Sequence, residues 1–137
     1  MNKNNILIVG NGELGTALGK ILSQNKKNQV TVWGEEPNLP SAEVVFMAVP
    51  TTAIENVVSK AKSTQSEDCI IVVLSKGLGS NGETPWELAD KNWDGPAVLI
   101  SGPMIAEELT AGKSGAGLVA GNRPVSIQKV VSLFPTA

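Results

Sequence analysis

The 137-residue sequence contains no histidine and only one cysteine, Cys69. Without histidine there can be no serine–histidine triad and no histidine acid–base catalysis, and a single cysteine excludes internal disulfides and thiolate zinc sites. We therefore expect no metal site. Because Cys69 opens an apolar run, we interpret it as a buried structural thiol.

The sequence also has no large excess of positive or negative charge and no long apolar run. The net charge is −2, and Lys26–Lys27 is too short to form a basic patch, so neither nucleic acid nor an anionic membrane is expected as a partner. No apolar run reaches the roughly 18 residues of a membrane span, and the run before Gly10 is too short for a signal-peptide core. With 42% hydrophobic and 18% charged residues, the chain is expected to be a folded, cytoplasmic protein.

Short apolar runs alternate with amphipathic segments along the whole chain. Continuous apolar runs are typical of strands buried on both faces. Such runs predict strands at 6–9, 44–49, 70–74 and 97–100, and the shorter apolar stretches at 29–33 and 116–120 are interpreted as strands as well.

Helices are predicted between these strands from apolar residues spaced three and four apart. The first presents Leu14, Ala17, Leu18, Ile21 and Leu22, and the second, capped by Thr52, presents Ile54, Val57, Val58 and Ala61. Pro85 favours a short helix within 84–90, and another helix is expected near 105–111. Pro124 opens a last helix with Ile127, Val130, Val131 and Phe134 on one face.

This alternation predicts an α/β fold, with right-handed crossovers and helices on both faces of the sheet. We expect a Rossmann-type, doubly wound, mostly parallel sheet in a single three-layer domain spanning residues 1–137.

A glycine-rich turn, Gly10-Asn11-Gly12-Glu13-Leu14-Gly15, stands between the first predicted strand and the first helix. In this context G-x-G-x-x-G is typical of dinucleotide binding: the first glycine permits a tight turn, the second lets a pyrophosphate approach, and the third lets helix and strand pack closely. Free N–H groups at the helix start would face the phosphates. We expect these six residues to bind a cofactor; the alternative is a structural turn without a ligand.

Acidic residues follow the second predicted strand. Glu35 lies roughly 20 residues beyond the glycines, where a carboxylate can accept hydrogen bonds from the adenosine ribose and would repel a 2′-phosphate. NAD is therefore expected as the cofactor, and NADP is less favoured. Alternatively, Glu35 and Glu36 only solvate a loop.

Four further stretches narrow this interpretation: VTVWGE (30–35), MAVPTTAI (47–54), LSKGLG (74–79) and ISGPMIAEEL (100–109). In order and content they resemble the N-terminal domain of bacterial NAD(P)-dependent glycerol-3-phosphate dehydrogenase, and the resemblance covers nearly the whole chain. The K-G-L and S-G-P-x-x-A-E-E segments are much more specific than the glycine motif.

The resemblance implies several cofactor contacts. Glu13 and Leu14 occupy positions whose backbone holds the cofactor phosphates. Pro50 and Ala106 occupy positions beside the cofactor. For Trp33, which ends the second predicted strand, a place in the core is favoured over stacking on the adenine.

Substrate contacts are implied as well. Lys76 matches a lysine that contacts both cofactor and substrate, and an ammonium there could attract a phosphorylated substrate or polarise a ketone. Lys76 is therefore the candidate catalytic residue, with Gly102 and Met104 beside the substrate. The family has serine where Met104 stands, and a thioether cannot donate a hydrogen bond.

The resemblance implies hydride transfer between NAD(H) and the glycerol 3-phosphate/dihydroxyacetone phosphate pair. The family's second, helical domain, with its catalytic lysine, is not within these 137 residues. We therefore expect this chain to bind a dinucleotide but to be nearly inactive alone, with a complementing domain or a homodimer as the possible partner. The alternatives are a non-catalytic dinucleotide-binding or sensing module and a reductase of another small ketone, such as a ketopantoate-like compound.

Overall fold

The computed structural model describes residues 2–34, 38–74, 77–102 and 117–135. Within these residues six strands form one sheet in the order β2-β1-β3-β4-β5-β6. Their bounds are β1 (Asn4–Val9), β2 (Asn28–Trp33), β3 (Val44–Met47), β4 (Ile70–Val73), β5 (Ala97–Ser101) and β6 (Leu118–Gly121). The predicted strands are confirmed, with shifted ends.

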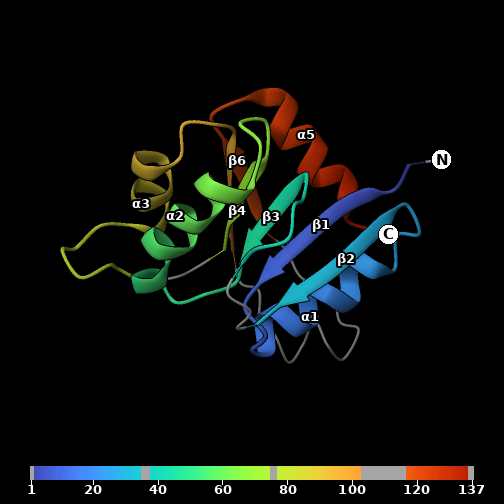
Figure 1. Cartoon of the computed structure of the whole chain (residues 1–137), viewed down its shortest axis with the longest axis horizontal. Coiled ribbons are helices and arrows are strands. Elements are labelled where there is room, and N and C mark those ends of the chain that lie inside the picture. Colours follow the sequence, from blue (N-terminus) through green and yellow to red (C-terminus); the bar gives the residue numbers. More distant parts are fainter. Residues whose placement is uncertain (1, 35–37, 75–76, 103–116, 136–137) are drawn as a thin grey trace.

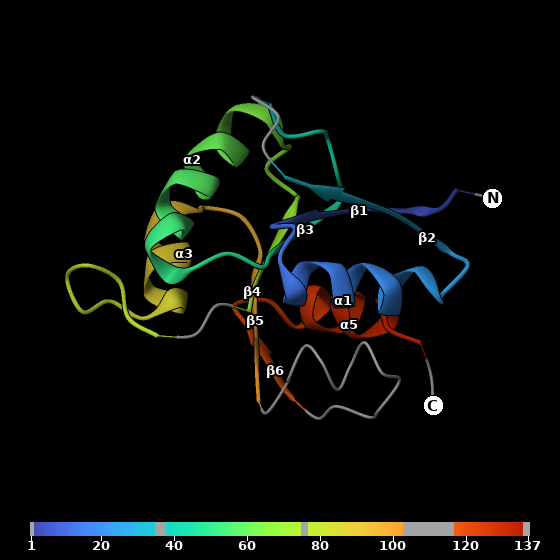
Figure 2. The same ribbon diagram turned by 90° about the horizontal axis from the view of Figure 1, so that it is seen from below.

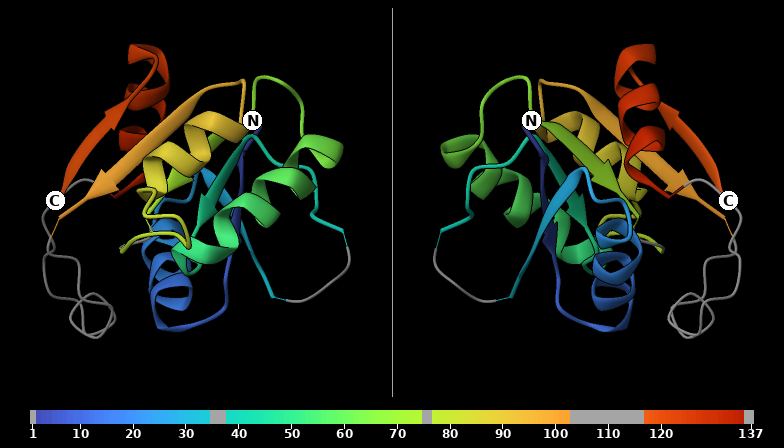
Figure 3. Two further views of the ribbon diagram at one scale, coloured as in Figure 1. Left: turned by 90° about the vertical axis from the view of Figure 1, so that its left-hand side faces the viewer. Right: turned by 90° about the vertical axis from the view of Figure 1, so that its right-hand side faces the viewer.

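The first five strands run parallel, and β6 pairs antiparallel with β5. In Figure 1 the arrowheads of β1, β2 and β3 lie together, and Figure 3 shows β6 at the end of the sheet away from β2. The central strands β3 and β4 are buried throughout, as their continuous apolar runs predict. The mostly parallel α/β sheet is therefore confirmed.

Helices cover both faces of the sheet (Figure 2). On one side lie α1 (Glu13–Ser23) and α5 (Pro124–Leu133), and on the other α2 (Ile54–Thr64) and α3 (Pro85–Asn92). Two hydrophobic clusters fill the layers between: one contains Ile6, Ile8 and Phe46, the other Leu7, Val9 and Val45. Alternate residues of one strand thus serve opposite faces, which gives the predicted three-layer arrangement.

Two helix details differ from the sequence prediction. Thr52 does not cap α2: it is exposed within a 3-10 turn, Thr51–Ala53, and α2 begins after Ala53 without a side-chain cap. In α5, Val131 is 52% exposed instead of facing the core. The other three predicted positions do face the core: Val130 is buried, and Ile127 and Phe134 pack against it partly buried. Ser126 and Leu133 are buried as well.

A capping box that the sequence prediction did not use fixes the start of α3. The Thr84 hydroxyl accepts a hydrogen bond from the Glu87 N–H at 3.1 Å, and the Glu87 carboxylate accepts one from the Thr84 N–H at 3.4 Å. Pro85 occupies the first turn, as predicted. The helix predicted near 105–111 lies outside the described residues.

Candidate functional site

The candidate site lies at the edge of the sheet where the parallel strands end. From β1 the chain passes through α1 to β2 on one side, and from β3 it passes through α2 to β4 on the other. The boundary between β1 and β3 is therefore a topological switch point, where open α/β sheets bind their ligands. The glycine loop follows β1 there, and the Ala48–Pro50 turn follows β3.

The loop after β1 is locked against the loop after β3 at Gly10. Gly10 has a φ of +115°, and a Cβ on it would collide with the carbonyl oxygen of Ala48. The Gly10 N–H donates to Trp33 O at 3.1 Å, and the Ala48 N–H donates to Val9 O at 2.8 Å. Only glycine fits this turn, which therefore ties together the ends of three adjacent strands.

The other two glycines differ in their surroundings. A Cβ on Gly15 would collide with the Gly10 carbonyl oxygen, so α1 packs directly on the turn. Gly12 precedes α1 without a side-chain cap, and a Cβ there would meet nothing within 4 Å. The tight turn and close packing predicted for Gly10 and Gly15 are present, and the space at Gly12 is open.

The side chains of the same loop have different environments. Asn11 is exposed, and its side-chain nitrogen lies 2.8 Å from where a Cβ on Gly34 would be. Glu13 is also exposed, whereas Leu14 is half-buried against the cluster that contains Ile6 and Ile8. Asn11 thus places the glycine loop beside the end of β2, and the Leu14 side chain serves packing.

The loops after β3 and β4 are joined by a buried hydroxyl. Pro50 is exposed, and its carbonyl accepts a hydrogen bond from the Ala53 N–H at 2.9 Å. Thr51 is buried and donates to Gly77 O at 3.3 Å. This contact places the segment that follows Lys76 beside the turn after β3.

Two glycines of the resemblance motifs have backbone conformations that side chains rarely adopt. Gly77 has a φ of +92° after β4, and Gly102 has a φ of +148° after β5. With Gly10, three of the loops at this edge therefore require glycine. The predictions for Glu35, Lys76, Met104 and Ala106 lie outside the described residues.

Three site-shaping residues were not singled out by the sequence analysis: Gly34, Thr51 and Gly77. All three lie in stretches that carry the family resemblance, so the motif itself was the available signal. Their contacts join segments about 25 residues apart and depend on the folded sheet.

Trp33 belongs to the core, as predicted. It is 7% exposed in the cluster with Leu7, Val9 and Leu39, and the Lys60 ammonium lies 5.2 Å from its ring centroid. A cation at this distance over an indole face is attracted by the ring. Trp33 therefore packs at the end of β2, in the hydrophobic layer between the sheet and α2.

Cys69 is buried, and loss of solvation raises the pKa of its thiol to about 12. Its burial confirms the interpretation of Cys69 as a buried structural thiol. In the described part of the chain, no group of three acidic or cysteine side chains is arranged to hold a metal ion. No described helix has the length and apolar character needed to cross a bilayer.

Several known enzymes are similar to this chain in sequence. The enzyme named glycerol-3-phosphate dehydrogenase [NAD(P)+] from Gloeobacter violaceus is 32% identical over 127 residues, covering 84% of this chain and 40% of the relative. Its namesake from Acaryochloris marina is 28% identical over 145 residues, covering 98% and 46%. The chain thus spans less than half the length of these two relatives.

The fold also matches a solved structure, that of glycerol-3-phosphate dehydrogenase from Coxiella burnetii. The TM-score is 0.84 at 23% identity, over 98% of this chain and 52% of that one. Residues 38–126 match the family described as NAD-dependent glycerol-3-phosphate dehydrogenase N-terminus. The chain therefore belongs to the N-terminal, NAD-binding domain family of NAD(P)-dependent glycerol-3-phosphate dehydrogenases.

Proposed function

We propose that this chain binds NAD(H) at the carboxyl edge of its sheet and forms the cofactor half of a glycerol-3-phosphate dehydrogenase. The observation that carries the proposal is the Gly10–Gly15 loop at the β1/β3 switch point, closed by backbone contacts at Gly10 and Gly15 but open at Gly12.

The diphosphate of the cofactor fits the open position. With no Cβ and no neighbour within 4 Å, Gly12 lets an anionic group approach the start of α1. The positive end of the helix dipole favours negative charge there. Asn11, Glu13 and Leu14 would contribute backbone groups around the same point, and Pro50 and Ala106 would line the nicotinamide side.

The choice between NAD and NADP depends on the segment after β2. Asn11 lies against Gly34, so the glycine loop and the end of β2 are adjacent. Glu35 follows Gly34 directly. A carboxylate there would accept hydrogen bonds from the ribose hydroxyls and repel a 2′-phosphate, which supports a preference for NAD.

The substrate would bind beside the loops after β4 and β5. When bound, the cofactor would supply the hydride for reduction of the dihydroxyacetone phosphate ketone, and the site would need a proton donor for the alkoxide that results. Lys76, next to Gly77, would attract the phosphate or polarise the ketone, with Gly102 and Met104 beside it. The second domain of the family would complete the site, so this chain alone should reduce the ketone poorly.

Dinucleotide titration tests the proposal. We expect saturable quenching of tryptophan fluorescence by NADH, and weaker binding of NADPH. Gly12→Val should weaken NADH binding at least about tenfold, a loss of about 1.4 kcal/mol, because the side chain would fill the phosphate approach. The fold should tolerate it, since nothing lies within 4 Å of the added Cβ.

Ala120→Val is the matched control, because Ala120 is exposed on β6, away from the glycine loop. It should leave NADH binding unchanged. Equal loss in both variants, or no saturable NADH binding by wild type, would overturn the proposal. Tighter binding of NADPH than NADH would contradict the role given to Glu35. NADH binding without dihydroxyacetone phosphate reduction is the result expected for the chain alone.

A further inference from the structure

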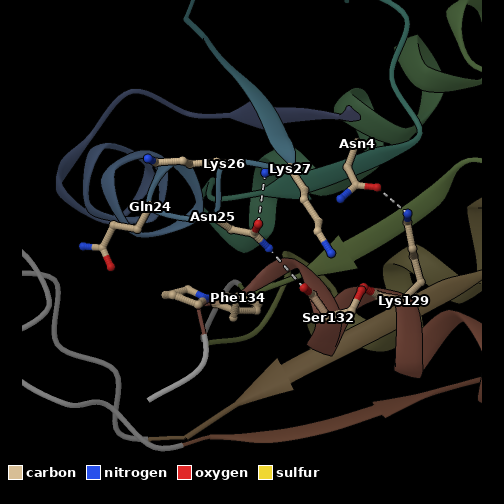
Figure 4. Close-up of a pocket in the computed structure, with 9 residues that line it drawn as sticks. Asn4, Gln24, Asn25, Lys26, Lys27, Lys129, Ser132 and Phe134 are labelled. Atoms are coloured by element: carbon tan, nitrogen blue, oxygen red, sulfur yellow. Dashed lines mark hydrogen bonds between the residues drawn. The ribbon is translucent and has the colours of Figure 1, made fainter. Parts of the chain in front are cut away.

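A polar hollow lies at the edge of the sheet opposite the glycine loop, where the strands begin. It has a volume of about 660 Å³ and is lined by Asn4, Gln24, Asn25, Lys26, Lys27, Lys129, Ser132, Phe134 and Pro135 (Figure 4). Asn4 opens β1, whereas the glycine loop follows Val9 at its end. At about 3.3 Å per residue, the length of β1 separates the two places by about 17 Å.

The hollow concentrates positive charge in a protein whose net charge is −2. Its lining includes three lysines and no carboxylate. The one ion pair among the described residues joins Lys91 to Glu83, elsewhere in the fold. None of the three lysines in the hollow therefore forms an ion pair with a described carboxylate.

Helix ends offset only part of this charge. The C-termini of α1 and α5 both lie at the hollow and together supply a negative charge of about one unit. Three ammonium groups carry more than that. The mutual repulsion of the remaining positive charge would be relieved by a bound anion.

Hydrogen bonds of Asn28, which contacts the lining residue Asn4 without lining the hollow itself, hold together the elements that form the hollow. Asn28 is buried and donates to Leu22 O and to Leu133 O, both at 2.8 Å, and it accepts from Asn4 Nδ2 at 3.0 Å. These bonds join the end of α1, the end of α5 and the starts of β1 and β2. The spacing of the lining residues is therefore set by the fold.

Lys26 and Lys27 lie in the turn between α1 and β2, and Lys129 lies on α5. In Figure 4 the side chain of Lys27 extends on the side of Lys129, whereas the side chain of Lys26 extends the other way, on the side of Gln24. Lys129 donates to Asn4 Oδ1 at 2.6 Å and also lines a neighbouring hollow that contains Glu43 and Asp68. Lys26 and Lys27 line this hollow and not the neighbouring one.

We infer that this hollow binds a small phosphate-bearing anion at a site separate from the dinucleotide edge. Ammonium groups and the Gln24 amide can donate hydrogen bonds to phosphate oxygens, and a volume of about 660 Å³ accommodates a small organic phosphate. The two edges of the sheet then bind phosphate by different means, backbone amides at one and lysines at the other.

Titration with inorganic pyrophosphate, followed by ¹H–¹⁵N NMR, tests this site residue by residue. The amides of Gln24, Asn25, Lys26, Lys27 and Ser132 should shift in a saturable way at about 1 mM or below. The double variant Lys26→Gln/Lys27→Gln should weaken this event at least about tenfold. NADH binding by the same variant should be unchanged, which separates the site from the glycine loop.

The charge-matched control is Lys20→Gln/Lys62→Gln, two exposed lysines that do not line the hollow. It should leave the pyrophosphate shifts within about twofold of wild type. Equal weakening by both double variants would show a general charge effect and overturn the inference. So would the absence of saturation at the Gln24–Lys27 amides up to about 10 mM.

Discussion

At the scale of single residues, the glycines of the Gly10–Gly15 loop perform different tasks. Backbone atoms crowd Gly10 and Gly15, so any side chain there would collide with a neighbouring carbonyl. Gly12 has free space around it. A substitution at Gly12 therefore reports on the ligand, whereas substitutions at the other two report on the fold.

Cys69 gives a residue-scale prediction about pH. Burial raises the pKa of its thiol to about 12, so in alkali the unfolded chain loses this proton first and gains stability. The share of the unfolding free energy that comes from keeping this thiol protonated is fully present below the ordinary pKa of a thiol, and it is lost as the pH rises toward 12. Relative to Cys69→Ala, the free energy of unfolding of wild type should fall by about 1.4 kcal/mol per pH unit above pH 9.

Urea unfolding of both proteins between neutral pH and the alkaline range measures this difference. The small cavity left by Cys69→Ala lowers stability equally at every pH, so only the slopes matter. Parallel curves for the two proteins would show that the thiol ionises normally in the folded state.

At the scale of elements, Thr84 is the N-cap residue of α3 and forms its capping box with Glu87. Thr84→Ala removes the hydroxyl that accepts the Glu87 N–H, and we expect a loss of about 1 kcal/mol in unfolding free energy. Thr52→Ala is the matched control, because Thr52 is exposed and no helix cap uses its hydroxyl. Chemical denaturation should place Thr52→Ala within about 0.5 kcal/mol of wild type. Equal losses in the two variants would contradict the capping role.

Element type was predictable where the apolar pattern was unambiguous. The buried runs at 44–49 and 70–74 could only be accommodated as central strands, and they are β3 and β4. Fine detail was less predictable. In α5 both Val130 and Val131 are apolar, and the packing against the sheet, not their hydrophobicity, decides that Val130 is buried and Val131 exposed.

Part of the site was predictable because a glycine motif encodes backbone geometry directly. The collisions at Gly10 and Gly15 follow from the strand–turn–helix context alone. The Asn11–Gly34 approach and the Thr51–Gly77 hydrogen bond could not be derived in that way, because each depends on which strands become neighbours in the sheet.

At the scale of the whole molecule, Asn28 holds together the layer formed by α1 and α5. Its amide donates to one carbonyl from each helix, Leu22 O and Leu133 O. Asn28→Ala would remove the shorter hydrogen bond from each carbonyl, while Asn25 still donates to Leu22 O at 3.3 Å and to Leu133 O at 3.4 Å. At about 0.5 to 1.5 kcal/mol for each lost bond, we expect a loss of about 2 kcal/mol, measured by urea unfolding, and faster amide hydrogen exchange in α5.

Asn5→Ala provides the comparison, because Asn5 is an exposed asparagine of β1 whose side chain, among the described residues, donates only to Ser41 O. Its effect should stay below about 1 kcal/mol. If Asn28→Ala were no more destabilising than Asn5→Ala, the contact between the two helices would be maintained by apolar packing and by Asn25, whose Nδ2 donates to Ser132 O at 3.3 Å and to Leu133 O at 3.4 Å.

The burial of the single cysteine has a practical consequence for labelling. A protonated, shielded thiol reacts slowly with maleimides, so a cysteine introduced at an exposed position would be the preferred attachment point for a fluorophore. A dye placed at one edge of the sheet or at the other would report ligand binding at that edge alone, and Cys69 would not have to be replaced first.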